Sequence, residues 1–310
     1  MISFRYHLVS IIAVFMALAL GVVMGTTVVK QGVVEGLKSQ ADQAISNSHR
    51  LQADVIQLQK EVKVQGDFLD QAQPWLVVGQ LDGSQVVIVT QQGVEASEID
   101  GIRRVLADPS AGAGAKVLAV IEVKPKMQLA DDGARAAMAA AVGGSPSDST
   151  TKLMRMAATD LSERLATGGS PGGSDFLQTM LSAGFLDMVG GSAAPSQIGG
   201  TGQALVLLSG GPTQPLVDPR AFMVPLASSL SMADRPVVAA EVSQTVYSFV
   251  PVLRQMQELK GRLVTVDDAD TVWGRVAVVL GLHNLLADPG HGGDYGGKDG
   301  ASTLIPSRLP

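Results

Sequence analysis

Polar residues lie at the carboxyl ends of five predicted buried strands, where an open α/β sheet places its ligands. They are Gln91, Glu122, the Ser209-Gly210-Gly211 segment, Glu241 and the Asp267-Asp268 pair. Three of these strand ends bear carboxylates, whose oxygens suit a hard metal ion. Carboxylates also serve as solvated strand ends and as helix N-caps, and Asp268 stands where a cap for the last predicted helix would lie. The second interpretation is the better one, so we assign no metal site to these residues.

Motifs for nucleotide binding or hydrolysis do not occur in the sequence. The Gly199-Gly200-Thr201-Gly202 segment precedes its predicted strand, whereas a phosphate-binding loop follows a strand and opens a helix. There is no Gly-x-Ser-x-Gly or His-Glu-x-x-His motif, and the four histidines are His7, His49, His283 and His291. His283 lies in a predicted helix, where packing or capping explains it better than catalysis. We expect no enzymatic activity and no resident cofactor.

The elements that would position these residues alternate between strand and helix from Trp75 onward. Short, continuous, Val-rich apolar runs are typical of strands buried on both faces of a parallel sheet. The predicted strands are 86–90, 117–123, 204–208, 237–241 and 263–266. The predicted helices are 94–107, 128–142, 150–166, 175–183, 218–230, 243–258 and 270–286. This order predicts a three-layer α/β domain with a mostly parallel sheet over residues 75–288.

Segments rich in glycine, serine and proline interrupt the middle of this domain and follow its end. Residues 143–149, 168–174 and 190–202 are predicted loops around a helical insertion. Residues 289–310 are rich in glycine and short of apolar side chains, which predicts an extended or disordered tail.

The N-terminal segment from Leu8 to Val29 contains no charged residue. A helix of this length measures roughly 33 Å and would cross a hydrocarbon core of about 30 Å. A cleaved signal peptide is the alternative, since Ala17-Leu18-Ala19 suits a signal peptidase, but the apolar run continues well beyond it. We interpret residues 1–7 as a cytoplasmic leader and 8–29 as a membrane helix. Gly21 and Gly25 form a Gly-x-x-x-Gly pair that permits close packing of two such helices.

Small and apolar residues then recur at alternating steps of three and four over residues 30–73. They are Val34, Leu37, Ala41, Ala44, Ser48, Leu51, Val55, Leu58, Val62, Gln65, Leu69 and Ala72. With Val34 at heptad position a, Val55 and Val62 occupy a positions and Leu51 and Leu58 occupy d positions, a combination that favours a parallel two-stranded coiled coil. Pro74 is expected to end this helix.

The sequence does not specify the partner of this seam as clearly as it indicates the seam itself. Few oppositely charged residues flank it, since Asp54 and Glu61 at g positions are accompanied by Gln52 and Gln59 at e positions. A homodimer is the first expectation and a heteromeric coiled coil the second, with Leu37, Leu51, Val55, Leu58, Val62 and Leu69 as the interaction residues. A helix packed on its own domain is the remaining alternative, but a helix of about 55 Å would overhang a domain of this size.

Composition excludes some classes of partner. The formal charge is −6, with 23 Lys and Arg in 310 residues and aromatics at 4%, so a nucleic-acid-binding surface is not expected. Cysteine is absent, which excludes disulfides and thiolate metal sites.

Several segments together resemble the MctB family of actinobacterial envelope proteins. They are residues 1–10 (MISFRYHLVS), 17–25 (ALALGVVMG), 274–280 (GRVAVVL) and 290–296 (GHGGDYG), so the likeness extends from end to end. The resemblance implies an envelope of the mycobacterial and corynebacterial kind. It also implies one of two roles: copper efflux across the outer membrane, or, as in the SteB branch, pairing with the membrane protein SteA to control cell-wall hydrolysis during division.

The residues bear on that choice. An outer-membrane pore needs strands of about 9–11 residues that alternate apolar and polar, whereas the predicted strands here are short and apolar throughout. Copper(I) favours clustered thioethers and imidazoles, but the 12 methionines are scattered. His283, His291 and Met154 are the best candidate copper ligands, and they form no recognisable set.

The sequence therefore predicts a single-pass protein of the cell membrane, with its C-terminal domain in the envelope. We expect a non-enzymatic interaction module whose coiled coil joins it to itself or to a SteA-like partner. Copper transport is the alternative.

Overall fold

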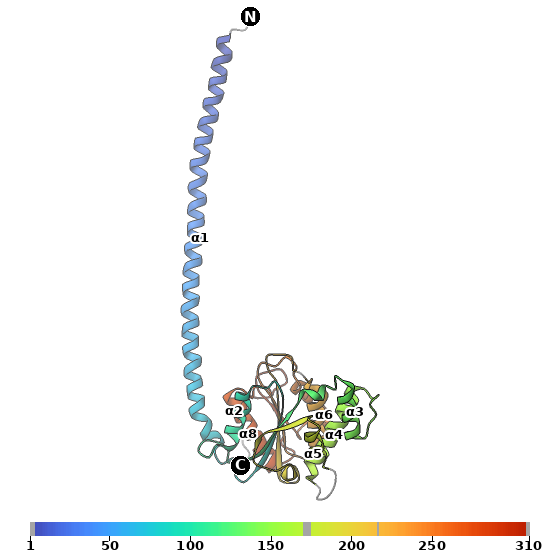
Figure 1. Ribbon diagram of the computed structural model, residues 1–310. Helices are drawn as coiled ribbons and strands as arrows, with labels where there is room; N and C mark the ends of the chain where they lie inside the picture. Colours follow the sequence, from blue (N-terminus) through green and yellow to red (C-terminus); the bar gives the residue numbers. More distant parts are fainter. Residues whose placement is uncertain (1–3, 170–174, 216, 308–310) are drawn as a thin grey trace. The chain divides into compact units, whose positions relative to one another are not determined.

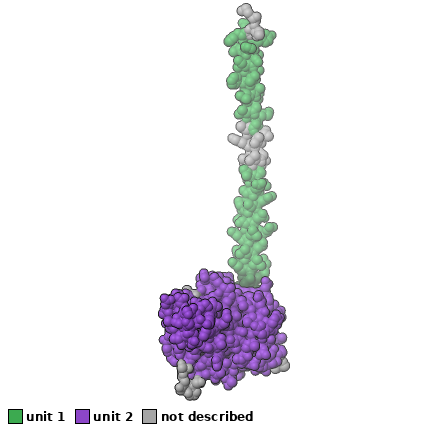
Figure 2. Space-filling view, turned by 90° about the vertical axis from the view of Figure 1, so that its right-hand side faces the viewer, with its two compact units in different colours: residues 1–66 green, residues 67–310 purple. Residues whose placement is uncertain are grey.

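The computed structural model describes residues 4–169, 175–215 and 217–307, with the backbone alone for residues 26–35. The chain divides into two compact units, residues 1–66 and 67–310 (Figure 2). The apolar segment and the heptad segment up to Gly66 form the first unit, and the last turns of their helix belong to the second.

The helix α1 (Phe4–Val77) contains both N-terminal segments. Its portion Phe4–Gly25 is long and apolar enough to cross a membrane. The helix does not end at Pro74 as expected, because it continues to Val77 and the Val78 N–H donates to the Pro74 carbonyl at 2.9 Å. Proline removes only its own N–H and the bond to the residue four earlier, so a few further residues complete the last turn.

The second unit is built on one seven-stranded sheet. Its strands are β1 (Gln85–Gln91), β2 (Lys116–Val123), β3 (Leu186–Gly191), β4 (Gln203–Ser209), β5 (Val237–Glu241), β6 (Val264–Val266) and β7 (Gly293–Tyr295), in the order β3-β2-β1-β4-β5-β6-β7. Every neighbouring pair is parallel except β2 and β3. The five predicted strands and the mostly parallel sheet are confirmed.

Helices cover both faces of the sheet, which confirms the three-layer α/β fold (Figure 1). The helices α2 (Ala96–Ala107) and α8 (Val272–Ala287) lie on one face. The other face is covered by α3 (Asp132–Val142), α4 (Thr150–Thr167), α5 (Phe176–Ser182), α6 (Pro219–Met232) and α7 (Val250–Arg254).

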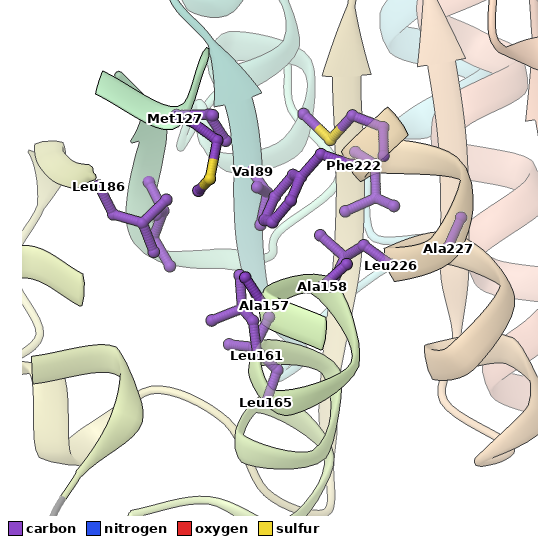
Figure 3. Packing of buried hydrophobic residues seen from close by; sticks show 14 of the residues in the cluster. Val89, Met127, Ala157, Ala158, Leu161, Leu165, Leu186, Phe222, Leu226 and Ala227 are labelled. Carbon is purple, nitrogen blue, oxygen red and sulfur yellow. The ribbon is translucent and has the colours of Figure 1, made fainter. Parts of the chain in front are cut away.

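Each face has its own apolar core because the strands are buried on both sides. Figure 3 shows the first core, which contains Val89 of β1, Leu161 of α4 and Phe222 of α6. In the second core, Ile88 of β1 is wholly buried together with Val279 of α8. The near-continuous Val-rich strands thus give the unit two cores.

The middle of the domain differs from expectation in two places. Residues 190–202 are largely the expected loop, with one 3-10 turn, but the strand β3 was not expected and its last two residues fall within that range. The strand β3 pairs antiparallel with β2. It is an edge strand with alternating burial that ends in Gly190-Gly191, so it lacks the apolar run of a central strand. The helix expected over 243–258 is reduced to α7 and a 3-10 turn, Gln257–Leu259.

Residues 289–310 were expected to be an extended or disordered tail, and their described part is ordered and contains an extended strand. Residues Gly293–Tyr295 form β7 beside β6, and Tyr295 and Ile305 pack against the second core. The tail then crosses closely over the end of β6, where a Cβ on Gly296 would lie 2.2 Å from the Asp267 Oδ1. Only glycine permits that approach, so a glycine-rich composition here reflects close packing.

Candidate functional site

Glu241, at the end of β5, is fully buried, and both of its carboxylate oxygens have hydrogen-bond partners within the protein. The backbone N–H groups of Phe249 and Val250 donate to Oε2 at 3.1 and 3.3 Å. The Ser248 hydroxyl donates to Oε1, and the Lys298 ammonium forms an ion pair with it at 3.0 Å. A carboxylate held in this way fixes the start of α7 and the tail.

Asp267, at the end of β6, has a similar structural role. It accepts from Arg254 Nη1 at 2.7 Å and from the Gly297 N–H at 2.9 Å. Arg254 also donates to the Thr265 hydroxyl at 2.9 Å and to the Tyr295 carbonyl at 2.8 Å. Because both charges are buried, the pair depends on these additional hydrogen bonds, and together they connect α7, β6 and the tail.

Asp268 differs from its neighbour because one of its oxygens has no partner. The indole N–H of Trp273 donates to Oδ2, whereas Oδ1 is buried without a hydrogen bond among the described atoms. Burial raises the pKa of Asp268 to about 6. The Trp273 hydrogen bond and Lys298 lower it, while Asp267 and Asp270 raise it further.

The expected role of Asp268 as an N-cap is not found. The cap of α8 is Thr271, whose hydroxyl accepts from the Gly274 N–H at 3.0 Å. Five residues, 267–271, separate β6 from α8, two more than the predicted bounds of strand and helix allowed, so the cap falls later in the chain.

The other strand-end residues form no common site. Glu122 pairs with Lys124 at 2.9 Å, and this hydrogen bond raises the pKa of the Lys124 ammonium. Gln91 and Ser209 are buried at the ends of β1 and β4. Across the part of the chain that the structure describes, no three His, Cys, Asp or Glu side chains are grouped so as to hold a metal ion.

The three candidate copper ligands lie apart. Met154 is buried in the first core, on α4, whereas His283 is on α8 at the opposite face of the sheet. The His283 Nδ1 is 2.8 Å from the Gln80 carbonyl oxygen, which agrees with a packing role. His291 is exposed beside Asp288, with Nδ1 3.2 Å from Oδ2.

The heptad seam is an exposed apolar feature of the part of the first unit that follows the apolar segment Phe4–Gly25. Its residues Leu37, Leu51, Val55, Leu58 and Val62 are 51–66% exposed. Val34 lies among the residues whose side chains are not described, and Leu69 is half-buried within the second unit. In the apolar portion of α1, no described atom lies within 4 Å of the Cβ positions of Gly21 and Gly25.

Arg254 and Lys298 are the residues of the strand-end cluster that sequence reasoning missed. Lys298 is 57 residues from its partner Glu241, and no local pattern joins the two. The acidic strand ends indicate that basic partners are needed, but the sequence does not indicate which of the domain's Lys and Arg residues they are.

The comparisons with known proteins identify the family of this chain. Residues 1–306 match the family described as "Copper transport outer membrane protein, MctB", so the chain belongs to the MctB family. The "Copper transporter MctB" of Mycobacterium tuberculosis (strain ATCC 25618 / H37Rv) is 27% identical over 326 residues, which cover 99% of this chain and 100% of that protein. The "Copper transporter MctB" of Mycobacterium leprae (strain TN) is 25% identical over 325 residues, covering 98% and 99% respectively. The resemblance inferred from the sequence is confirmed.

Proposed function

We propose that this protein is a membrane-anchored, non-enzymatic interaction module of the cell envelope. The helix Phe4–Gly25 serves as a single-pass anchor, and the heptad segment pairs with a second copy or with a SteA-like membrane protein in control of the cell wall during division. The α/β unit then presents the regulatory surface.

The observation that supports this proposal is the exposed heptad seam. Burial of a large aliphatic side chain contributes about 1.5–3 kcal/mol, so a seam of five exposed Val and Leu residues is a strong drive for association in water. Val at a positions and Leu at d positions favour two parallel strands. The strand-end carboxylates offer no competing site, because Glu241 and Asp267 are held by Lys298 and Arg254.

The test replaces Leu51 and Leu58 with Asp and measures the mass of the chain from Lys30 onward by analytical ultracentrifugation. Charges at two d positions should abolish the dimer, or capture of the partner, while the α/β unit stays folded. A matched control replaces Ala53 and Lys60, both at outward f positions, with Asp. If the Leu51→Asp/Leu58→Asp protein keeps both its assembled mass and its partner, the seam is not the interface.

Copper transport is the second candidate, and the names of the family and of the mycobacterial relatives favour it. Copper would then be cargo, taken up by ligands from separate elements or from more than one chain. Titration of the purified protein with Cu(I) separates the two functions. The first proposal expects no stoichiometric site tighter than about micromolar, roughly −8 kcal/mol.

Substitution of the candidate ligands completes this test. His283→Gln and His291→Gln remove imidazoles, and Met154→Leu removes a thioether with little change of volume in the core. A tight Cu(I) site that any of these substitutions abolishes would favour transport over the interaction module.

A further inference from the structure

Two aromatic side chains are exposed on the last turns of α1, inside the second unit. Trp75 is 89% exposed and Phe68 is 68% exposed. Both occupy position g when the heptad frame of the first unit is continued, and Leu76, also exposed, occupies position a. Pro74 falls at the outward position f, and the helix continues past it to Val77. The helical periodicity of the seam therefore continues past the proline, with Leu69 and Ala72 half-buried on this part of it.

A different side of this helix segment, away from Phe68 and Trp75, faces the rest of the second unit. Val77 is wholly buried, and Asp70 and Gln73 line a cavity of about 340 Å³ together with residues of α2 and α8. Steps of about 100° per residue place Phe68 and Trp75 on nearly the opposite side of the helix from Asp70 and Val77. Folding of the unit thus leaves both rings in solvent.

We propose that Phe68 and Trp75 bind a second copy of this chain at the C-terminal end of the seam. We call these two residues the aromatic collar. The inference rests on the proposed pairing through the seam. In a parallel coiled coil, a g residue of one helix lies beside the e residue of the next heptad in the other helix. Phe68 would therefore lie against the half-buried Gln73 of the second copy.

Three features favour a second copy as the occupant. The collar continues the same heptad frame as the seam, so a partner seated on the seam reaches it in register. Within that frame the Phe68 ring faces polar, uncharged Gln73, with no charge to bury. Exposed tryptophan is also the residue type that most often dominates binding energy at an interface. Symmetry would repeat the contact, so each dimer would gain it twice.

The experiment uses the full chain in detergent with 5-fluorotryptophan at its two tryptophans, Trp75 and Trp273. The Trp75→Phe protein assigns the ¹⁹F resonances. We expect the Trp75 resonance to be shielded from a soluble paramagnetic quencher in the dimer and to become exposed in the Leu51→Asp/Leu58→Asp protein. Replacing both Phe68 and Trp75 with Gln should weaken dimerisation by at least about tenfold. The control Ile56→Gln changes an exposed residue at position b of the same helix and should leave it unchanged.

The outcomes separate this inference from the proposed function. A dimer in which Trp75 stays open to the quencher would contradict the collar and leave the seam intact. The collar is also wrong if Trp75 is equally shielded in the protein with both leucines replaced, since the cover would then be intramolecular. Failure of the unmodified chain to self-associate would overturn the collar, and capture of a SteA-like partner alone would leave only the heteromeric form of the proposed function.

Discussion

At the scale of single residues, the carboxylates at two strand ends connect the sheet to α7 and to the C-terminal tail. Glu241 and Asp267 look like candidate ligands in the sequence, but Lys298 and Arg254 neutralise them and neighbouring N–H groups fill their remaining acceptor positions. The sequence correctly identified strand-end carboxylates. It could not identify their partners, because those partners approach from α7 and from the tail.

The pKa of Asp268 predicts a pH-dependent stability. Its folded pKa lies at about 6 and its ordinary value is 3.8, so the folded protein binds more protons than the unfolded chain between these values. The free energy of unfolding should therefore fall as pH rises from about 4 to 6, by up to about 3 kcal/mol from this residue alone. Asp268→Asn should remove that slope.

Urea denaturation of both proteins at pH 4.5 and pH 7.5 measures the effect. Asn keeps an oxygen for the Trp273 indole, so the substitution tests the charge more than the hydrogen bond. An identical pH dependence in the two proteins would mean that Asp268 titrates near its ordinary value.

At the scale of elements, we predict that packing of the C-terminal tail on β6 stabilises the second unit. Gly296→Ala would place a Cβ within 2.2 Å of Asp267 Oδ1 and should lower the free energy of unfolding by about 2 kcal/mol or more. Gly83 is the matched control, since it too has a positive φ but has no described atom within 4 Å of its Cβ position. Gly83→Ala should cost only about 1 kcal/mol.

Equal losses of stability in the two alanine proteins, measured by urea denaturation, would show that the tail does not pack on β6 in solution. A larger loss for Gly296→Ala supports the close approach.

The elements that sequence predicted best are those with one dominant signal. The buried strands β1, β2, β4 and β5 are Val-rich apolar runs, and their bounds differ from the predicted ones by one residue at most. The missed strands β3 and β7 lie at the sheet edges, where one side of each strand has no pairing partner and little apolar burial is required. Residues 243–258 have helical spacing, but much of the segment instead forms a loop in which Ser243 and Thr245 bond to nearby polar atoms.

At the scale of the whole molecule, the chain belongs to the MctB family, whose description names copper transport. The described residues include no group of three His, Cys, Asp or Glu side chains that could hold a metal ion. The open sheet has β3 and β7 at its edges, and helices cover its two faces. In the proposed function, a partner buries the exposed apolar residues of the heptad segment, and the protein acts through that partner.

The most direct measurement of that claim uses the absence of cysteine from the chain. Single cysteines at Leu51 and at Val55, introduced into the full chain in membranes, should each give a disulfide-linked homodimer, because identical d or a positions of a parallel, in-register coiled coil lie within disulfide reach. Cysteine at Ala53, on the outward side, should give none. A link to a different protein at Leu51 and Val55 would support the heteromeric form, whereas equal crosslinking at all three positions, or none at any, would contradict pairing through the seam.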